Sequence, residues 1–532
     1  MMLKRFFTSI INEFSCIINQ ESKNTRISIV IILFVGTLLS FYSFYFFLSN
    51  KIFLIGSDAF YYLSIADSIL NNGEVKTLST IPSYPVKSPQ NGIVFVHMIL
   101  SLLGIGAKGR ILSIVVFNYL LYLSAVYPLY KIARMSGLNK GLPLVSLLSV
   151  YLGAWHIYRL NLIAYNDGIF NSLIIWLLYF IIKLACDNDA DNPLFLVSRS
   201  VITRLVFIGL MVMLLIHFRL NVVLVVGSAV LSALAIRNYR LTFWFSSICA
   251  LLLLSFFAVY IFVEVQRFEN IGQKYFFPLL GAFGIDTIKL QLWKILPRLV
   301  AGASTITNPL ASLCFTVFPL SMMYYGIKGI MDKEFSRVFI AGVCLTGLWF
   351  TMSFQNARVI WYTIPFIYLI IFNIKKIRLV GYFIVLIVFL QSFQQFFIGF
   401  SRPNGSSQLW LHIYENKISL PDDALLLSRD RQHPYFFLGN RVFLGTESWQ
   451  EVRKKIAAPD IFLPKVSWNL IKEKRNIYAF GPNSYLDRAF SQMENTVSKN
   501  EYTVSVNRLT PELNKFKGWA LLEFSIHNKS SK

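Results

Sequence analysis

Charged residues are scarce in this chain, and acidic residues are scarcer than basic ones. Only 14% of the 532 residues are charged, whereas 55% are hydrophobic and 16% are aromatic. Soluble domains carry about 25% charged residues. The composition therefore excludes an ordinary soluble protein and indicates a polytopic membrane protein.

Motifs for metal, disulfide and nucleotide chemistry are absent. No two of the five cysteines form a C-x-x-C pair, and the six histidines form no H-x-H or H-E-x-x-H pattern. The cysteines therefore encode no disulfide framework, and we assign no metal ligand, although the sequence leaves metal dependence open. No phosphate-binding loop, dinucleotide fingerprint or G-x-S-x-G elbow occurs, so ATP-driven transport and serine-hydrolase chemistry have no sequence support.

Basic residues are abundant by comparison, and the formal net charge is +23. Most of those before residue 400 flank apolar runs, as the positive-inside rule requires, so we exclude nucleic acid and take the bilayer as the partner. We predict eleven spans, with the N-terminus cytoplasmic and the C-terminus outside. They lie at about residues 27–49, 110–130, 142–157, 167–185, 203–217, 220–236, 241–263, 305–327, 338–353, 358–374 and 379–398.

The predicted fold class is thus an all-α polytopic membrane protein with a small C-terminal α/β domain. Residues 1–399 form the transmembrane module, and residues 400–532 form the extracytoplasmic domain, with predicted strands at 424–427, 478–480 and 519–526 and a helix at 449–456. Short apolar helices at 57–72, 92–103 and 286–299 are too short to span a bilayer. We expect them to lie at its outer surface.

Asp58 is the leading candidate for chemistry. It begins the helix over residues 57–72, directly after the first span, where the helix dipole favours an ionised carboxylate. Asp167 begins a later span on the same predicted side, so the two acids could form a paired-carboxylate site. The alternative for each is a helix N-cap without a chemical role, and for Asp167 this alternative is as well supported as the functional one. Asp67, on the polar face of the first interfacial helix, is expected to be solvated.

Three basic residues lie at predicted outer turns and could bind a phosphate. Arg219 and Arg358 flank spans, and Lys87 precedes the second interfacial helix. Arginine offers bidentate hydrogen bonds to phosphate, whereas the alternative for arginine at span ends is snorkelling to lipid headgroups.

In its order of motifs, the chain resembles the GT-C superfamily of polytopic glycosyltransferases, which includes protein mannosyltransferases and lipid A aminoarabinose transferases. The resembling segments are Asp58 in Asp-Ala-Phe-Tyr-Tyr, Lys87-Ser88-Pro89 through Leu103-Gly104, Arg110 to Gly137, Asn161 to Leu177, His217 to Asn221, and Arg358 to Pro365. The resemblance extends over most of residues 27–530, including the extracytoplasmic domain. One departure is Ser57, which precedes Asp58 where the family has paired acids.

The resemblance implies an inverting transfer of a sugar from a polyprenyl-phosphate donor to an extracytoplasmic glycan, lipid or protein. Asp58 would act on the acceptor hydroxyl, and Lys87, Arg219 and Arg358 would stabilise the departing lipid phosphate. The lipid-linked sugar is then a co-substrate, no cofactor is assigned, and the bacterial inner membrane is the expected location. Alternatives are a non-catalytic transporter or flippase of lipid-linked glycans, a glycan polymerase or ligase, and a structural subunit.

Overall fold

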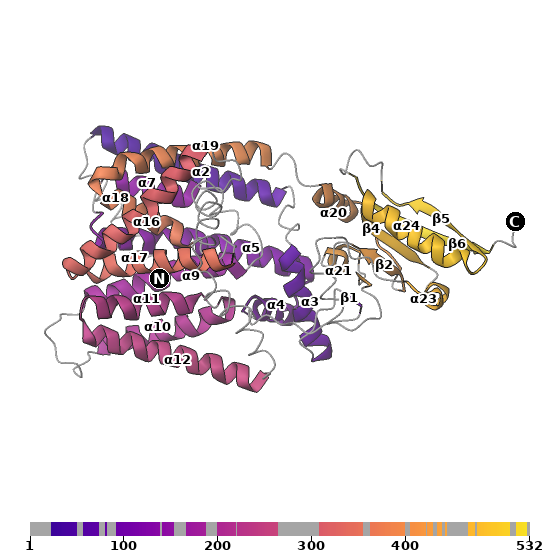
Figure 1. The fold of residues 1–532 in the computed structure, drawn as a ribbon, viewed down its shortest axis with the longest axis horizontal. Helices are drawn as coiled ribbons and strands as arrows, with labels where there is room; N and C mark the ends of the chain where they lie inside the picture. The colour runs from indigo at the N-terminus through magenta and orange to yellow at the C-terminus, as the bar shows by residue number, and fades with distance from the viewer. Residues whose placement is uncertain are drawn as a thin grey trace. The chain divides into compact units, whose positions relative to one another are not determined.

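The structure is a computed structural model of the whole chain. It describes residues 23–49, 57–73, 80–81, 92–138, 141–153, 166–187, 199–219, 221–263, 308–354, 362–399, 405–421, 423–428, 433–438, 442–443, 466–473, 476–510 and 518–528. These residues belong to two compact units (Figure 1). The first comprises residues 1–47, 89–92 and 115–397, and the second comprises residues 48–88, 93–114 and 398–532.

The first unit is helical. Its described helices are α2 (Lys23–Ser49), the later part of α5 (Ala107–Ser124), α6 (Val126–Met135), α7 (Leu142–Gly153), α9 (Asn166–Cys186), α10 (Arg199–Phe218), α11 (Val222–Ala235), α12 (Tyr239–Val263), α16 (Asn308–Met331), α17 (Phe335–Phe354), α18 (Ile364–Asn373) and α19 (Arg378–Gly399). Every predicted span overlaps a helix. By length and composition, three of the described stretches could cross a membrane: 107–135, 167–186 and 201–218. The count of eleven spans stays a prediction.

Polar contacts between these helices are few and specific. The Tyr151 hydroxyl donates to the Tyr122 carbonyl at 3.0 Å, and the Tyr122 hydroxyl donates to the Tyr151 carbonyl in return. Ser228 on α11 and Thr346 on α17 hydrogen-bond through their hydroxyls at 3.1 Å. Because an unpaired polar group in an apolar interior is costly, such bonds fix how neighbouring helices meet.

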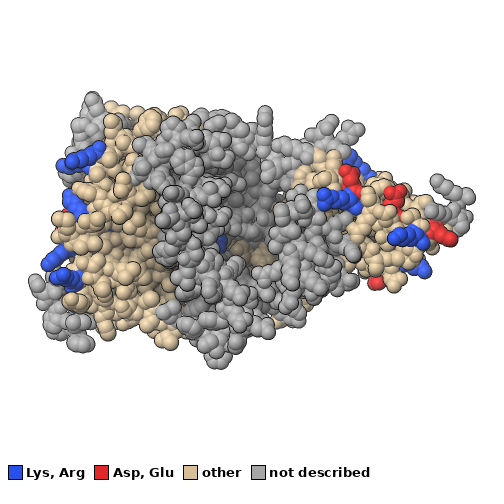
Figure 2. All heavy atoms as spheres, viewed as in Figure 1, with Lys and Arg blue, Asp and Glu red and all other residues tan. Residues whose placement is uncertain are grey.

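Large apolar side chains on the helix surfaces remain exposed. Phe207, Leu210 and Leu214 on α10 are about half exposed, as are Phe243 and Leu251 on α12. Soluble proteins rarely expose apolar stripes of this size, whereas lipid-facing helices do. With the apolar runs of the sequence, these stripes identify an integral membrane protein. Figure 2 shows Lys and Arg along one end of the unit.

The second unit contains a six-stranded sheet with the strand order β1-β3-β2-β4-β6-β5. Its strands are β1 (Thr80–Ile81), β2 (Leu425–Ser428), β3 (Val442–Phe443), β4 (Ile477–Pro482), β5 (Tyr502–Arg508) and β6 (Trp519–Asn528), and its helices are α3 (Ser57–Asn72), α4 (Gly92–Leu102), α20 (Gly405–Glu415), α21 (His433–Phe437), α23 (Trp468–Glu473) and α24 (Asn483–Ser498). The amphipathic helix α24 packs its buried residues Tyr485, Ala489 and Met493 into the same core as Ile477 and Phe524 of the sheet.

The three predicted strands are confirmed as β2, β4 and β6. The predicted helices over 449–456 and 286–299 lie outside the described residues. The sequence did not reveal that the first loop contributes a strand: Thr80 of β1 pairs in parallel with Val442 of β3. The boundary predicted at residue 399 stays a prediction, although residues 48–88 and 93–114 group with the C-terminal region.

Candidate active site

A buried ion pair joins two of the predicted site residues. Asp167 lies in the first turn of α9, and Arg219 directly follows α10. The Arg219 Nη2 atom lies 2.5 Å from Asp167 Oδ1, and the two side chains are 10% and 1% exposed. The sequence proposed an acid and a phosphate ligand separately, and the structure places the two in contact.

The helix ends favour this pair. The N-terminus of α9 carries a partial positive charge that suits the Asp167 carboxylate, and the C-terminus of α10 suits the Arg219 guanidinium. A guanidinium has five N–H donors, and the Nε of Arg219 has no hydrogen-bond partner among the described residues. Arg219 can therefore contact Asp167 and still donate to an anion.

One turn along α9, Asn171 connects the pair to another part of the chain. Its Nδ2 donates to the Asp167 carbonyl at 2.7 Å, and its Oδ1 accepts from the Tyr362 backbone N–H at 3.0 Å. The Phe170 ring also meets the Tyr362 ring edge-on, with 5.9 Å between centroids. Tyr362 stands four positions after Arg358, which lies outside the described residues.

A second chain segment meets Phe218, the neighbour of Arg219. Gly92 packs so closely on the Phe218 ring that an added Cβ would lie 2.8 Å from it, well inside van der Waals contact. Only glycine fits this approach without a shift. Gly92 stands five positions after Lys87, which also lies outside the described residues. The placement of Lys87 and Arg358 in one cavity with Arg219 therefore stays a prediction.

Asp58 lies in the first turn of α3, as predicted, but its side chain is outside the described part of the structure. The body of α3 is well anchored. Phe60 packs against the rings of His433, Phe436 and Phe437 at 5.1, 4.8 and 5.4 Å between centroids. The helix that carries Asp58 is therefore held in place by the C-terminal region.

The expectation that Asp67 is solvated was wrong. Its side chain is only 16% exposed, and its Oδ1 accepts a hydrogen bond from Arg110 Nη1 at 2.8 Å. The Tyr435 hydroxyl donates to Oδ2 at 3.4 Å. Both partners are remote in sequence, so no local pattern could have indicated them, and the contacts lock α3 in position.

His97 on α4 is fully buried, and neither ring nitrogen has a hydrogen-bond partner within the described part of the chain. Burial, together with the nearby Arg110 guanidinium, lowers the pKa of His97 to about 3. The ring is therefore neutral at physiological pH. Within the described residues, no three His, Cys, Asp or Glu side chains are placed to hold a metal ion.

Comparison with known proteins gave structural neighbours only. No protein-family profile and no curated protein sequence matches this chain. Among solved structures, it is similar to the archaeal oligosaccharyltransferase AglB from Archaeoglobus fulgidus, in complex with an inhibitory peptide and a dolichol-phosphate. The identity is 10% and the TM-score 0.47, over 95% of this chain and 75% of that one.

It is also similar to ArnT from Cupriavidus metallidurans bound to undecaprenyl phosphate, with 14% identity, a TM-score of 0.43, and coverage of 93% of this chain and 97% of that one. The same protein in its apo state gives the same values.

Proposed function

We propose that this protein is a membrane glycosyltransferase that moves a sugar from a polyprenyl-phosphate donor to an extracytoplasmic acceptor with inversion. The observation that carries the proposal is the buried Asp167–Arg219 pair at one end of membrane-length helices. Gly92, five positions after Lys87, packs against Phe218. Tyr362, four positions after Arg358, hydrogen-bonds to Asn171 beside the pair. In the proposal, Lys87 and Arg358 join Arg219 around the lipid phosphate.

In the proposed reaction, an acceptor hydroxyl oxygen attacks the anomeric carbon of the donor. The new C–O bond forms as the bond between that carbon and the phosphate oxygen breaks, and the electron pair leaves with the polyprenyl phosphate. Asp58 accepts the hydroxyl proton. Arg219, with Lys87 and Arg358, stabilises the negative charge that grows on the departing phosphate.

Asp167 acts in this scheme through Arg219. A carboxylate at 2.5 Å fixes the direction of the guanidinium and leaves other donors free for phosphate. Asp167 is then a positioning residue, and Asp58 alone is the general base. The competing assignment is that Asp167 is a second carboxylate that contacts the acceptor. A positioning role through Arg219 would affect the KM for the donor, whereas contact with the acceptor would affect the KM for the acceptor.

Release of polyprenyl phosphate tests the reaction class. Membranes containing the protein would receive a polyprenyl-phosphate sugar and a candidate acceptor extract, and both the free lipid phosphate and the sugar product would be measured. Wild type should release lipid phosphate in proportion to product, and Asp58→Asn should fold but release none. A flippase would move the donor without releasing lipid phosphate, and that result would refute the proposal.

Substitution of Arg219 tests the phosphate assignment. Arg219→Lys keeps the charge but loses the planar guanidinium fork, so the KM for the donor should rise by roughly tenfold or more, corresponding to about 1.4 kcal/mol or more of lost binding. Arg204→Lys, on the same helix but at its other end, should leave KM unchanged. An Asp167→Asn variant that changes the acceptor KM alone would support the competing role for Asp167.

A further inference from the structure

A pocket lies at the other end of the first unit. It has a volume of about 470 Å³ and is bordered by the ends of α6, α9, α11 and α17, among others. α9 contains 21 residues, so Cys186 in this pocket is about 30 Å along the helix from Asp167. That distance equals the thickness of a bilayer's hydrocarbon core. The pocket therefore lies at the opposite membrane–water boundary from the candidate active site.

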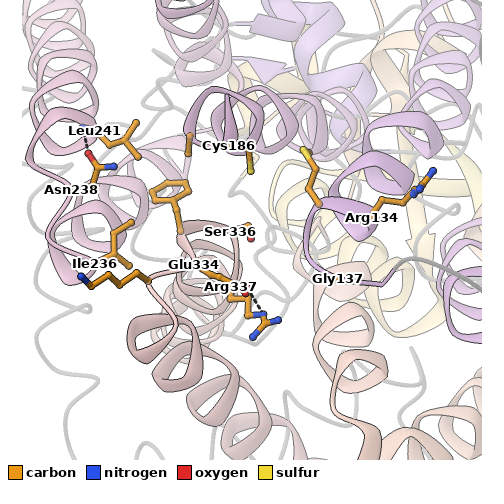
Figure 3. A pocket seen from close by; sticks show the side chains of 13 residues that line it. Arg134, Gly137, Cys186, Ile236, Asn238, Leu241, Glu334, Ser336 and Arg337 are labelled. Carbon is orange, nitrogen blue, oxygen red and sulfur yellow. Dashed lines mark hydrogen bonds and ion pairs between the residues drawn. The ribbon is translucent and has the colours of Figure 1, made fainter. Parts of the chain in front are cut away.

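The pocket lining combines apolar side chains with cations and the carboxylate of Glu334. Figure 3 shows Cys186 and Ser336 near its middle and Arg134 and Arg337 at its edge. Arg337 is ion-paired with Glu334 at 2.6 Å and with Asp332 at 2.9 Å. Arg134 forms no ion pair within the described residues; its Nη1 donates to the Tyr130 hydroxyl at 3.1 Å. Lys333, also in the lining, has no ion pair among the described residues either.

The backbone at Lys333 is strained. Lys333 lies two residues after the end of α16 with φ = 54°, in the left-handed region that favours glycine, whereas Gly137 lies two residues after the end of α6 at the same pocket with φ = 91°. A lysine in this conformation costs roughly 1 kcal/mol relative to glycine. Stability alone would thus favour glycine at position 333. The lysine instead places a cation at the edge of a pocket between membrane helices.

We propose that this pocket binds the phosphate headgroup of an anionic membrane lipid. Basic pockets between membrane helices at the cytoplasmic boundary suit such headgroups, and each Lys or Arg near the surface adds about 1 kcal/mol of attraction. The N-terminus of α17, with Ser336 in the lining, adds backbone N–H donors of the kind that bind phosphate. The apolar walls suit the glycerol and upper acyl chain better than a free ion.

Two glycine substitutions form a matched test. Lys333→Gly removes a cation from the pocket lining and relieves backbone strain. Arg237→Gly relieves the same kind of strain just after α11, where φ is 59°, but removes a cation that does not line the pocket. The purified variants would be examined by native mass spectrometry with phosphatidylglycerol and with phosphatidylcholine. Wild type and Arg237→Gly should retain phosphatidylglycerol in preference to phosphatidylcholine. In Lys333→Gly, the affinity for phosphatidylglycerol should fall roughly fivefold, as expected for the loss of one cation.

Alkylation of Cys186 gives a second readout. This thiol is exposed and lines the pocket, so phosphatidylglycerol should slow its reaction with a maleimide, and peptide mapping would separate it from the other cysteines. Equal retention of both lipids, or loss in Arg237→Gly equal to that in Lys333→Gly, would overturn the proposal. Protection of Cys186 by inorganic phosphate as effective as that by the lipid would identify a free-anion site and overturn the lipid assignment.

Discussion

The two ends of α9 carry the same kind of ion pair in opposite surroundings. At its start, Asp167 is 1% exposed and pairs with Arg219 just after α10; at its end, Asp187 is 44% exposed and pairs with Arg204 near the start of α10. The two helices are thus tied at both ends by aspartate and arginine. The two ion pairs differ in burial, because water and salt screen the exposed pair but not the buried one.

The comparison shows why the buried pair is the better functional candidate. Exposed pairs contribute about 0–1 kcal/mol, so the Asp187–Arg204 pair can be lost at little cost. A buried pair brings little net stability over apolar side chains but is costly to break. A net gain in stability therefore does not explain the Asp167–Arg219 pair, whereas the proposed phosphate binding would.

The largest difference in stability between the two pairs should appear when the aspartate of each is replaced by alanine. Asp167→Ala leaves the Arg219 charge buried without its partner, and we expect it to lower the free energy of unfolding by about 3–5 kcal/mol. Asp187→Ala should lower it by about 0–1 kcal/mol. Thermal unfolding in detergent compares the two, and replacing both Asp167 and Arg219 by leucine should recover much of the loss. Equal losses of stability in Asp167→Ala and Asp187→Ala would contradict the conclusion that only the Asp167–Arg219 pair is shielded from water.

The packing beside the buried pair can be disturbed without touching a charge. Gly92→Ala places a methyl group 2.8 Å from the Phe218 ring, and we expect overpacking to cost about 1–3 kcal/mol. Adding Phe218→Leu should relieve the clash and restore part of the stability. Gly106→Ala is the control, because no atom lies within 4 Å of the added Cβ. A loss in Gly92→Ala that Phe218→Leu does not reduce would show that the ring is not the obstacle.

His97 offers a third case, a buried ionisable group without a described partner. Its pKa is lowered in the folded protein to about 3, so the unfolded chain binds the proton more readily between about pH 6.5 and 3. Its contribution to stability is therefore complete above pH 6.5 and is lost as pH falls, by about 1.4 kcal/mol per unit. Below pH 6.5, the free energy of unfolding should fall less steeply with falling pH in His97→Phe than in wild type. Parallel profiles would contradict this.

The smallest effect is the response of the exposed pair to salt. Raising ionic strength from about 0.01 to 1 M shortens the screening length from about 30 to 3 Å. The coupling energy between Asp187 and Arg204, measured by a double-mutant cycle, should fall from at most about 1 kcal/mol towards zero. The coupling between Asp167 and Arg219 should change little, since no solvent layer surrounds that pair.

The sequence predicted the helices well because each span is a continuous apolar run bounded by basic residues. It also placed Asp58 and Asp167 at helix starts, since a polar residue ahead of an apolar run is a local signal. It could not predict that Asp167 and Arg219 meet, because their contact depends on how α9 and α10 pack. The error at Asp67 has the same cause: its partners Arg110 and Tyr435 come from distant segments.

The C-terminal sheet shows the same limit. β4 and β6 are apolar and buried enough to be recognised, whereas β5 has a mostly exposed, alternating pattern and was missed. β1 has only two residues and becomes a strand only when β3 is beside it. A strand this short has no periodicity of its own to detect.

The pairing of β1 with β3 has a consequence for biosynthesis. Thr80 leaves the ribosome early, but its partner Val442 is made only after the helices between them have entered the membrane. Until then, β1 has no neighbour, and a C-terminal fragment made alone would expose the edge of β3 that β1 covers. Such an unprotected edge invites pairing with other chains. We expect the fragment from residue 400 onward to aggregate when expressed alone and to stay soluble when a peptide spanning residues 74–88 is supplied.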